Sequence, residues 1–194
     1  MNQEVKMKPS YLKIAFFDRD GTIIKDYPDE KWREIKEPEF LEGSIEGLKR
    51  LKEMGYDFII ITNQYLINDG IISLNDYQQF TGKFLKKLKE ENIDILKIYF
   101  CPHNEKDHCH CKKPKPGMIE QAKKDFLIDM NNSIYIGDSH VDYLLAKHFN
   151  LTFYGINYHD DNVKSYHSIL DISKQIKKRF KINESFINFL KHIQ

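Results

Sequence analysis

Two aspartates separated by one residue form the part of this sequence best suited to chemistry. The segment Asp18-Arg19-Asp20-Gly21-Thr22 follows the apolar run Ile14–Phe17, so both aspartates are expected where a buried strand ends. One carboxylate of such a pair can attack a substrate or bind a metal while the other moves a proton, and Gly21 allows the tight turn between them and the next element. Taken alone, the segment also fits an ordinary acidic turn after a strand.

Three further segments carry polar groups at the end of an expected strand or the start of a helix. Thr62-Asn63 follows Phe58–Ile61, and its hydroxyl and backbone N–H groups suit a phosphate oxygen. Lys113 lies among prolines just before a helix, where its ammonium can offset the charge of a phosphoryl group. Asp138, after the strand Ile134–Ile136, can complete a site for a hard cation. Simpler interpretations exist for each: a helix cap for Thr62, a loop lysine for Lys113 and an N-cap for Asp138.

All three cysteines lie in one short segment, which also holds several histidines. The pattern Cys101-x-His103-x5-Cys109-x-Cys111 offers soft ligands suited to tetrahedral zinc, with His108 and His110 as competing ligands. An odd, clustered set of cysteines favours a metal over disulfides. Four protein ligands leave no position for water, so the zinc is expected to be structural and to hold the loop that presents Lys113. The alternative is a flexible loop with reduced cysteines.

The elements that must position these groups alternate along the chain. Apolar runs predict strands, and segments with helical periodicity separate them, which together predict a parallel sheet with helices on both faces. The expected strands are Ile14–Phe17, Phe58–Ile61, Ile98–Phe100, Ile134–Ile136 and Thr152–Ile156. The first expected helix runs from Ser44, as its N-cap, to about Met54, with Gly55 as its stop. The second, Leu74–Glu91, is expected to turn Phe80, Phe84, Leu85 and Leu88 inward. Two further helices are expected at Met118–Phe126 and Val141–Phe149.

Composition favours one globular domain without a strong charge bias. The 194 residues are 41% hydrophobic, and 30 Lys and Arg against 29 Asp and Glu give a net charge of +1. Such a chain has no global attraction to nucleic acid or to anionic membranes, and neither an export signal nor a membrane span is evident, so a cytoplasmic protein is expected. Beyond residue 160, Ile169–Phe180 and Ile182–Ile193 are amphipathic, and their basic face is interpreted as solvated surface rather than a nucleic-acid patch.

Four motifs in order resemble those of haloacid dehalogenase-like phosphatases: DRDGT, ITNQ, KKPKPGM and GDSHVD, within residues 14–156. The cysteine segment resembles the zinc-loop branch, which holds D-glycero-D-manno-heptose bisphosphate phosphatases and histidinol-phosphate phosphatases. The resemblance implies a Rossmann-like, three-layer α/β/α sandwich with a mostly parallel sheet. No large cap domain is expected, because the interval from Asp18 to Thr62 is too short for one. Residues 1–194 would form a single domain, with a motif-bearing core at about 11–158 and a helical tail at about 160–194.

The same resemblance assigns roles to individual residues. Asp18 would be the nucleophile and Asp20 the general acid/base of a phosphomonoester hydrolase that forms an aspartyl-phosphate. The resemblance also implies phosphate binding by Thr62, Asn63, Lys112 and Lys113. It implies Mg²⁺ binding by Asp18, Asp138 and the Asp20 carbonyl, with Asp142 supporting these ligands without binding the metal itself. Structural Zn²⁺ would be bound by Cys101, His103, Cys109 and Cys111, with His103 ranked before His108 and His110.

The expected partner is a small phosphorylated metabolite, acted on by a monomer or small homo-oligomer, with neither nucleic acid nor membrane. A sugar phosphate such as D-glycero-D-manno-heptose 1,7-bisphosphate comes first, then histidinol phosphate, then a polynucleotide end, because DxDGT also occurs in enzymes that trim such ends. Lys112 replaces the arginine usual in the heptose branch, and Asp69 is expected to disfavour a second phosphate. Tyr27 and Trp32 either line the substrate site or pack on their own loop.

Overall fold

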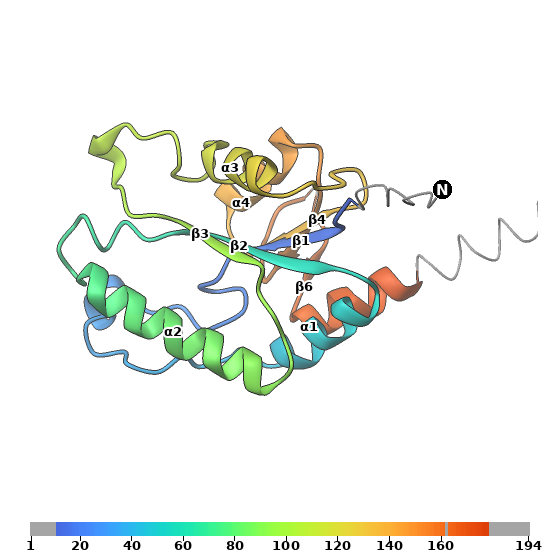
Figure 1. Cartoon of the computed structure of the whole chain (residues 1–194), viewed down its shortest axis with the longest axis horizontal. Coiled ribbons are helices and arrows are strands. Elements are labelled where there is room, and N and C mark those ends of the chain that lie inside the picture. The colour runs from blue at the N-terminus through green and yellow to red at the C-terminus, as the bar shows by residue number, and fades with distance from the viewer. Residues whose placement is uncertain (1–10, 162, 179–194) are drawn as a thin grey trace, which may run out of the picture.

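A sheet of six parallel strands organises the protein, as seen in a computed structural model that describes residues 11–161 and 163–178 (Figure 1). The strand order is β3-β2-β1-β4-β5-β6, and every neighbouring pair is parallel. The strands are β1 (Ile14–Phe17), β2 (Asp57–Asn63), β3 (Lys97–Cys101), β4 (Ile134–Gly137), β5 (Thr152–Ile156) and β6 (Ser165–Tyr166).

The central strand β1 is buried on both faces, as its unbroken apolar run predicts. Ala15 and Phe17 pack into one hydrophobic cluster, and Ile14 and Phe16 pack into the other. Helices α1 (Ser44–Glu53) and α2 (Leu74–Glu90) cover the first face, whereas α3 (Gly117–Asp125) and α4 (His140–His148) cover the second (Figure 1). The predicted three-layer α/β/α sandwich is therefore confirmed.

The start of α1 differs from the prediction. Gly43, with φ +74°, is the N-cap, and Ser44 is the first helical residue instead of the cap. The Ser44 hydroxyl is buried and has no hydrogen-bond partner among the described residues. Helix α1 nevertheless ends as expected, with Gly55 following the C-cap residue Met54 at φ +81°, a conformation that favours glycine.

Helix α2 is well capped, but one of its predicted inward residues is not inside. The Ser73 hydroxyl accepts a hydrogen bond from the Asp76 amide at 3.0 Å, and the Asp76 carboxylate accepts one from the Ser73 amide at 3.1 Å. Phe84 and Leu88 are fully buried, whereas Leu85 is 36% exposed. The prediction for Leu85 was wrong because one step along the helix turns a side chain by about 100° from its neighbour.

The first predicted tail helix packs on the body of the protein. Residues 169–178 are helical and run beside α1 (Figure 1). Ile169, Ile172 and Ile176 of this segment are buried in the same cluster as α1 and α2. The second predicted helix, Ile182–Ile193, lies outside the described residues. Among the described helices, none is both long and apolar enough to cross a bilayer.

The strand order also marks where a site is expected. The chain leaves β1 toward β2 on one side, and β4 lies on the other side of β1. Loops at the carboxyl ends of β1 and β4 therefore diverge and leave a crevice between them. Asp18 directly follows β1, and Asp138 directly follows β4.

Candidate active site

A pocket of about 200 Å³ opens at the carboxyl ends of β1, β2 and β4. Asp18 enters it at the end of β1, where its backbone N–H donates to the Ile136 carbonyl at 3.0 Å. The pocket is lined by Asp18, Asp20, Asp26, Asp29, Trp32, Thr62, Asn63, Gln64, Tyr65, Leu66, Lys113, Asp138, Ser139 and Val141. The four motifs thus meet at one place, although they are far apart in the sequence.

Lys113 supplies a buried positive charge beside Asp18. Its Nζ lies 2.5 Å from Asp18 Oδ1 and 2.8 Å from Asp142 Oδ1. Burial alone would lower the pKa of Lys113, but the carboxylates of Asp142 and Asp18 outweigh it and raise the pKa. Lys113 is therefore charged, and its ammonium is placed to meet the negative charge of a group bound at Asp18.

Asp142 is fully buried, and its carboxylate is already occupied by protein donors. Its Oδ1 accepts from the Tyr135 hydroxyl at 2.9 Å as well as from Lys113, and its Oδ2 accepts from the Ser139 hydroxyl and, at 3.3 Å, from the Ser139 amide. Gly137 is required nearby, because an added Cβ would come within 2.6 Å of the Asp142 Cβ. Asp142 holds Lys113 in place from behind the pocket.

Asp138 completes a group of three carboxylates. Oxygen atoms of Asp18, Asp138 and Asp142 all lie within 4.8 Å of one another. Thr22 donates to Asp138 Oδ1 at 3.2 Å, and a side chain at position 21 would collide with the Asp138 carboxylate, so only glycine fits there. Burial raises the pKa of Asp138 to about 6, with Asp142 adding to the shift. Burial also raises the pKa of Asp18, despite the opposing effect of Lys113.

These carboxylates fit a hard divalent cation. Mg²⁺ prefers oxygen ligands and keeps several waters, so two carboxylates and a carbonyl suffice for it. Asp18 and Asp138 border the pocket, whereas Asp142 is sealed behind it. Burial, together with repulsion from neighbouring carboxylates, raises the pKa values of Asp18 and Asp138, and a bound cation would stabilise their charged forms.

Asp20 faces the same pocket and is held from two directions. Gln64 Nε2 donates to Asp20 Oδ2 at 2.7 Å and to Thr62 Oγ1 at 2.9 Å, so one amide ties the first motif to the second. On the other side, Arg19 binds both oxygens of Asp20 at 2.9 Å, in a bidentate pair. Asp20 is therefore fixed beside Asp18. Among the described residues, no ion pair joins Asp20 to Lys113.

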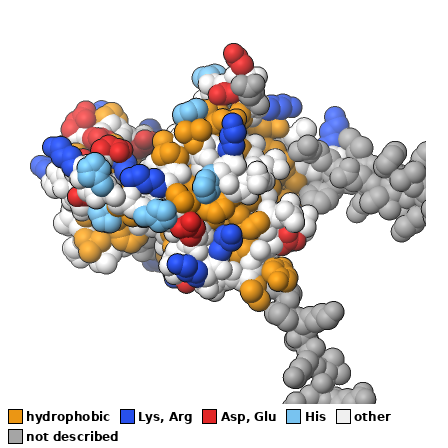
Figure 2. Space-filling model, turned by 90° about the horizontal axis from the view of Figure 1, so that it is seen from above, with side chains coloured by type: hydrophobic (Ala, Val, Ile, Leu, Met, Phe, Trp, Pro, Cys, Tyr) orange, Lys and Arg blue, Asp and Glu red, His pale blue; other side chains and the backbone are white. Residues whose placement is uncertain are grey.

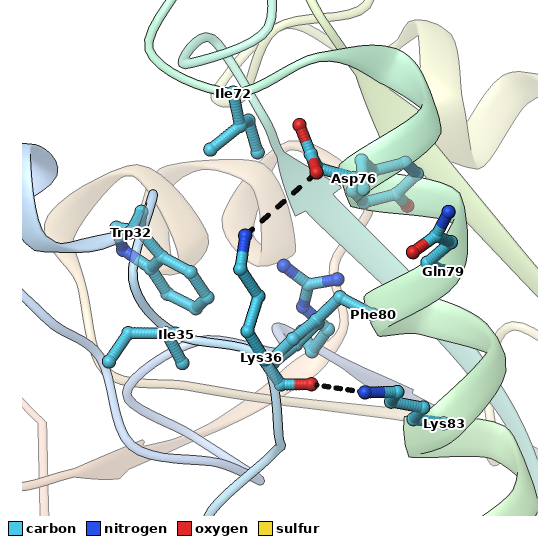
Figure 3. Close-up of a pocket in the computed structure, with 10 residues that line it drawn as sticks. Trp32, Ile35, Lys36, Ile72, Asp76, Gln79, Phe80 and Lys83 are labelled. Carbon is cyan, nitrogen blue, oxygen red and sulfur yellow. Dashed lines mark hydrogen bonds and ion pairs between the residues drawn. The ribbon is translucent and has the colours of Figure 1, made fainter.

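Arg19 itself is enclosed, with 1% of its surface exposed. Its guanidinium carbon lies 5.2 Å from the centre of the Phe80 ring and 5.3 Å from that of Tyr77. Arg19 is among the residues that line a second pocket, of about 110 Å³ (Figure 3). Trp32, Ile35 and Phe80 border that pocket, and Lys36 reaches across it toward Asp76, at 3.9 Å.

Asn63 and Lys112, the two remaining predicted phosphate ligands, differ in position: Asn63 lines the pocket and Lys112 does not. The Asn63 side chain accepts from the Lys113 amide at 2.8 Å and donates to the Lys113 carbonyl at 3.3 Å, so it fixes the backbone of the lysine loop as well as lining the pocket. Lys112 is not among the lining residues. Its ammonium pairs with Glu105 at 2.8 Å and lies 5.0 Å from the Tyr65 ring centre.

A second group of possible metal ligands lies beside the lysine loop. Cys101, His103, Cys109 and Cys111 offer four donor atoms within 4.8 Å of one another. His103 Nδ1 lies 3.1 Å from the Cys111 sulfur and 3.5 Å from that of Cys101. Three sulfurs and one imidazole are a donor set typical of structural zinc. Zinc lies about 2.3 Å from each sulfur in such sites, and donor atoms this close together can surround one ion at that distance.

The competing histidines are not part of this cluster. His110 points its Nε2 to Glu120, at 2.8 Å, and is largely exposed. His108 ends the short helix η2 (Glu105–Asp107) in a left-handed conformation, φ +46°. Burial tends to raise the pKa of Cys109, but hydrogen bonds from the Lys112 amide and from Cys101 outweigh it and lower the pKa to about 7, which favours a thiolate ligand.

The family described as polynucleotide kinase 3 phosphatase matches residues 13–186. This chain belongs to that family. Among its curated relatives is a D-glycero-α-D-manno-heptose-1,7-bisphosphate 7-phosphatase of Photorhabdus laumondii, 42% identical over 144 residues that cover 70% of this chain and 77% of the relative. A β-anomer 7-phosphatase of Pasteurella multocida is 40% identical over 141 residues, which cover 70% and 76%.

Solved structures agree on the fold of this phosphatase family. A D,D-heptose 1,7-bisphosphate phosphatase from B. bronchiseptica, complexed with magnesium and phosphate, superposes with a TM-score of 0.76 at 20% identity, covering 87% of this chain and 99% of the other. A HAD-like phosphatase from Mesorhizobium loti gives 0.75 at 21% identity, covering 88% of each chain. The predicted relationship of this chain to haloacid dehalogenase-like phosphatases is confirmed.

Several residues that line the pocket were not singled out from the sequence. Gln64 is buried between Asp20 and Thr62, and its place directly after Thr62-Asn63 was an available signal. Asp26 and Asp29 line the outer part of the pocket, where Tyr65 donates to both oxygens of Asp29 at 2.9 and 3.0 Å. No sequence pattern identified them, because their position depends on how the loop after Thr22 folds.

The two alternatives for the loop aromatics both hold in part. Trp32 lines the active-site pocket and is also buried against Phe80, with ring centres 5.5 Å apart. Its indole N–H donates to the Asp26 carboxylate at 3.3 Å. Tyr27 is not among the lining residues; it packs on Trp32 at 5.6 Å and donates to Glu39 at 2.7 Å.

Proposed function

We propose that this protein is a Mg²⁺-dependent phosphomonoester hydrolase that acts on a sugar phosphate through an aspartyl-phosphate at Asp18. The observation that carries the proposal is the meeting of Asp18, Asp20, Asp138 and Lys113 in one pocket, with Lys113 Nζ 2.5 Å from Asp18 Oδ1. Relatives at 40% and 42% identity are named heptose-bisphosphate phosphatases, which supports a sugar phosphate as the substrate class.

The residues divide the reaction as follows. Asp18 attacks phosphorus in line with the leaving oxygen, Asp20 donates a proton to that oxygen, and Asp20 then takes a proton from the water that hydrolyses the acyl phosphate. Lys113 and the Thr62 hydroxyl contact the phosphoryl oxygens, and Gln64 keeps Asp20 and Thr62 aligned. Mg²⁺, held by Asp18, Asp138 and the Asp20 carbonyl, would offset the charge that otherwise repels the nucleophile.

The cysteine cluster is proposed to bind structural Zn²⁺ through Cys101, His103, Cys109 and Cys111. Its four donors leave no open position, and its chain leads directly into Lys112 and Lys113. The zinc would hold the loop from which Lys113 enters the pocket, and it would take no part in proton or phosphoryl transfer. Lys112, paired with Glu105, would contact only the outer part of a bound substrate.

A polynucleotide end is not favoured as substrate, in spite of the family's name. The face that carries α3 and α4 shows acidic, basic, apolar and histidine side chains side by side (Figure 2). The net charge of the whole chain is +1. Binding of nucleic acid depends on many phosphate contacts by basic side chains, and the described part of the pocket contributes one lysine. A small phosphorylated molecule therefore fits the pocket better.

The proposal is tested by replacing the two aspartates separately. Asp18→Asn is expected to reduce turnover of sugar phosphates at least about 1,000-fold, and Asp20→Asn about 100- to 10,000-fold, both with normal far-UV circular dichroism. Acid-quenched wild-type enzyme is expected to carry one labile phosphate, which Asp18→Asn lacks. Glu30→Gln, an exposed carboxylate outside the pocket lining, is the control. Undiminished turnover by Asp18→Asn would contradict the covalent route.

A further inference from the structure

Tyr65 is the residue at which three loops of the active site meet. It follows Gln64 after β2, and it is one of the residues that line the pocket. Its hydroxyl donates to both carboxylate oxygens of Asp29, on the loop after β1, at 2.9 and 3.0 Å. The centre of its ring lies 5.0 Å from the ammonium of Lys112, on the loop after β3. Tyr65 therefore connects the loop after β2 to the loops on both sides of it.

The segment 65–72, which carries this tyrosine, is bound on both sides. Asn68 Nδ2 donates to the Asp107 carboxylate at 2.9 Å, which ties the segment to the loop after β3. Arg33 Nε donates to the Ile71 carbonyl at 2.6 Å, which ties it to the loop after β1. Backbone hydrogen bonds within the segment add to these contacts. The segment therefore presents the aromatic ring as a fixed wall of the pocket.

Tyr65 is the more exposed of the two aromatic residues in the pocket lining. Trp32, the other one, is 7% exposed and packs against Phe80. Tyr65 is only partly buried, so its ring is the aromatic surface that a substrate would meet. Partial burial and the hydrogen bond to Asp29 raise the pKa of the Tyr65 hydroxyl to about 12, so this hydroxyl remains a donor near neutral pH.

We infer that Tyr65 is a specificity-determining residue that limits the size of the substrate's remote end, so that one sugar ring is accepted and a second ring attached to it is not. The inference rests on the proposed phosphatase function and specifies the substrate class of the same pocket. The pocket has a volume of about 200 Å³, and Tyr65 can give way to a larger group only by losing its contacts with Asp29 and Lys112. Selection by size makes no demand on the charge of the remote group.

Two matched pairs of phosphomonoesters test the size limit. Glucose 6-phosphate is compared with trehalose 6-phosphate, and phenyl phosphate with 1-naphthyl phosphate, so that the members of each pair differ by one ring. For the wild type with Mg²⁺ near neutral pH, we expect kcat/KM to favour the smaller member of each pair. Tyr65→Ala is expected to reduce that preference about tenfold, mainly by lowering KM for the larger member. A variant with a damaged fold would not gain activity on the larger compounds.

A second variant separates the ring of Tyr65 from its hydroxyl. Tyr65→Phe keeps the ring but loses the hydrogen bond to Asp29, so the preference for the smaller compounds is expected to fall by a smaller factor than in Tyr65→Ala. Tyr11→Ala is the matched control, because Tyr11 is 66% exposed, precedes β1 and is not among the lining residues, and it is expected to change neither ratio. Equal use of both members of each pair by the wild type, or unchanged ratios in Tyr65→Ala, would overturn the inference.

A binding measurement separates this inference from the proposed function. Calorimetric titration of Asp18→Asn with the same four compounds and Mg²⁺ reports affinity without turnover. If the wild type hydrolyses none of them, but Asp18→Asn binds the smaller members more tightly and adding Tyr65→Ala removes that difference, the proposed function fails and the size limit stands. If the wild type hydrolyses them and neither KM nor affinity differs within a pair, the inference fails and the function stands.

Discussion

A buried arginine holds the carboxylate that is proposed to transfer protons. Arg19 binds both oxygens of Asp20, and its third nitrogen donates to the Thr81 hydroxyl at 3.3 Å. Burial tends to lower the pKa of Arg19, but the charge of Asp20 outweighs it and raises the pKa. A planar fork in a ring of aromatic side chains can adopt few orientations, so Arg19 is suited to fixing the direction in which Asp20 points.

Arg19→Lys tests this positioning role. Lysine keeps the charge but cannot form the bidentate pair, so we expect kcat to fall about tenfold to 100-fold, with little change in KM or in Mg²⁺ affinity. Steady-state kinetics and a magnesium titration measure these quantities. Arg50→Lys is the matched control, because Arg50 is a partly exposed arginine of α1 paired with Glu46. If Arg19→Lys retained the kcat of Arg50→Lys, the bidentate pair would have no part in catalysis.

At the scale of single residues, the sequence predicted the groups at the carboxyl ends of strands: Asp18 and Asp138 follow β1 and β4, and Thr62 lies near the end of β2. Asp18, Thr62 and Asp138 could be placed together because parallel strands bring their carboxyl ends to one edge of the sheet. Asp26 and Asp29 could not be placed, because they lie on a loop whose path is set by packing of Trp32 against Phe80. Such long-range contacts leave no periodic signal in the sequence.

Secondary-structure elements were predicted well where burial is continuous. The bounds of β1 agree with the prediction, because a central strand of a parallel sheet is covered by helices and reads as an unbroken apolar run. The bounds of β5 agree as well, although Thr152 at its start is exposed. Strand β6 was missed because two residues are too short to show alternation, and it forms only by pairing with β5 at Gly155 and Ile156. Ser44 was misplaced because Gly43 adopts the left-handed conformation at the N-cap position.

The loop that carries the cysteine cluster is the element whose order is expected to depend on a metal. It begins at β3 and ends at α3, where Gly117 donates to the His110 carbonyl at 3.1 Å. In between, the protein contacts of Lys113 are the Asn63 amide and the two buried carboxylates. Without zinc, the stretch from Cys101 to Cys111 would be held mainly by exposed polar contacts, such as those of Asn68 with Asp107 and of Asn104 with Asp69.

Metal analysis and hydrogen exchange test this dependence. Protein purified without chelators is expected to hold about one zinc per chain, and Cys109→Ser substantially less. Removal of zinc is expected to speed amide exchange in residues 101–116 far more than in α2, and to lower kcat through Lys113. His110→Asn is the control, because its ring lies outside the cluster and should leave the zinc content unchanged. Substoichiometric zinc in the wild type would contradict the assignment.

On the scale of the whole molecule, segments from opposite ends of the chain share one core. Ile169, Ile172 and Ile176 pack in the cluster that also holds Phe17 of β1 and Leu48 of α1. The approach is close at Gly47, where an added Cβ would lie 2.5 Å from backbone atoms of Ile169 and Leu170. The residues after the fourth motif therefore contribute to the stability of the body that carries the active site.

Two glycines in helices give a matched test of this packing. Alanine is about 1 kcal/mol better than glycine in a helix interior, so Gly82→Ala in α2, with open space around it, should raise the free energy of unfolding by up to about 1 kcal/mol. Gly47→Ala gains the same propensity but must displace the backbone at Ile169, so it should lower that free energy by about 1–3 kcal/mol. Urea unfolding followed by circular dichroism measures both. If Gly47→Ala were as stabilising as Gly82→Ala, the segment 169–178 could not lie against α1 in solution, because the added methyl group would then have met no neighbour.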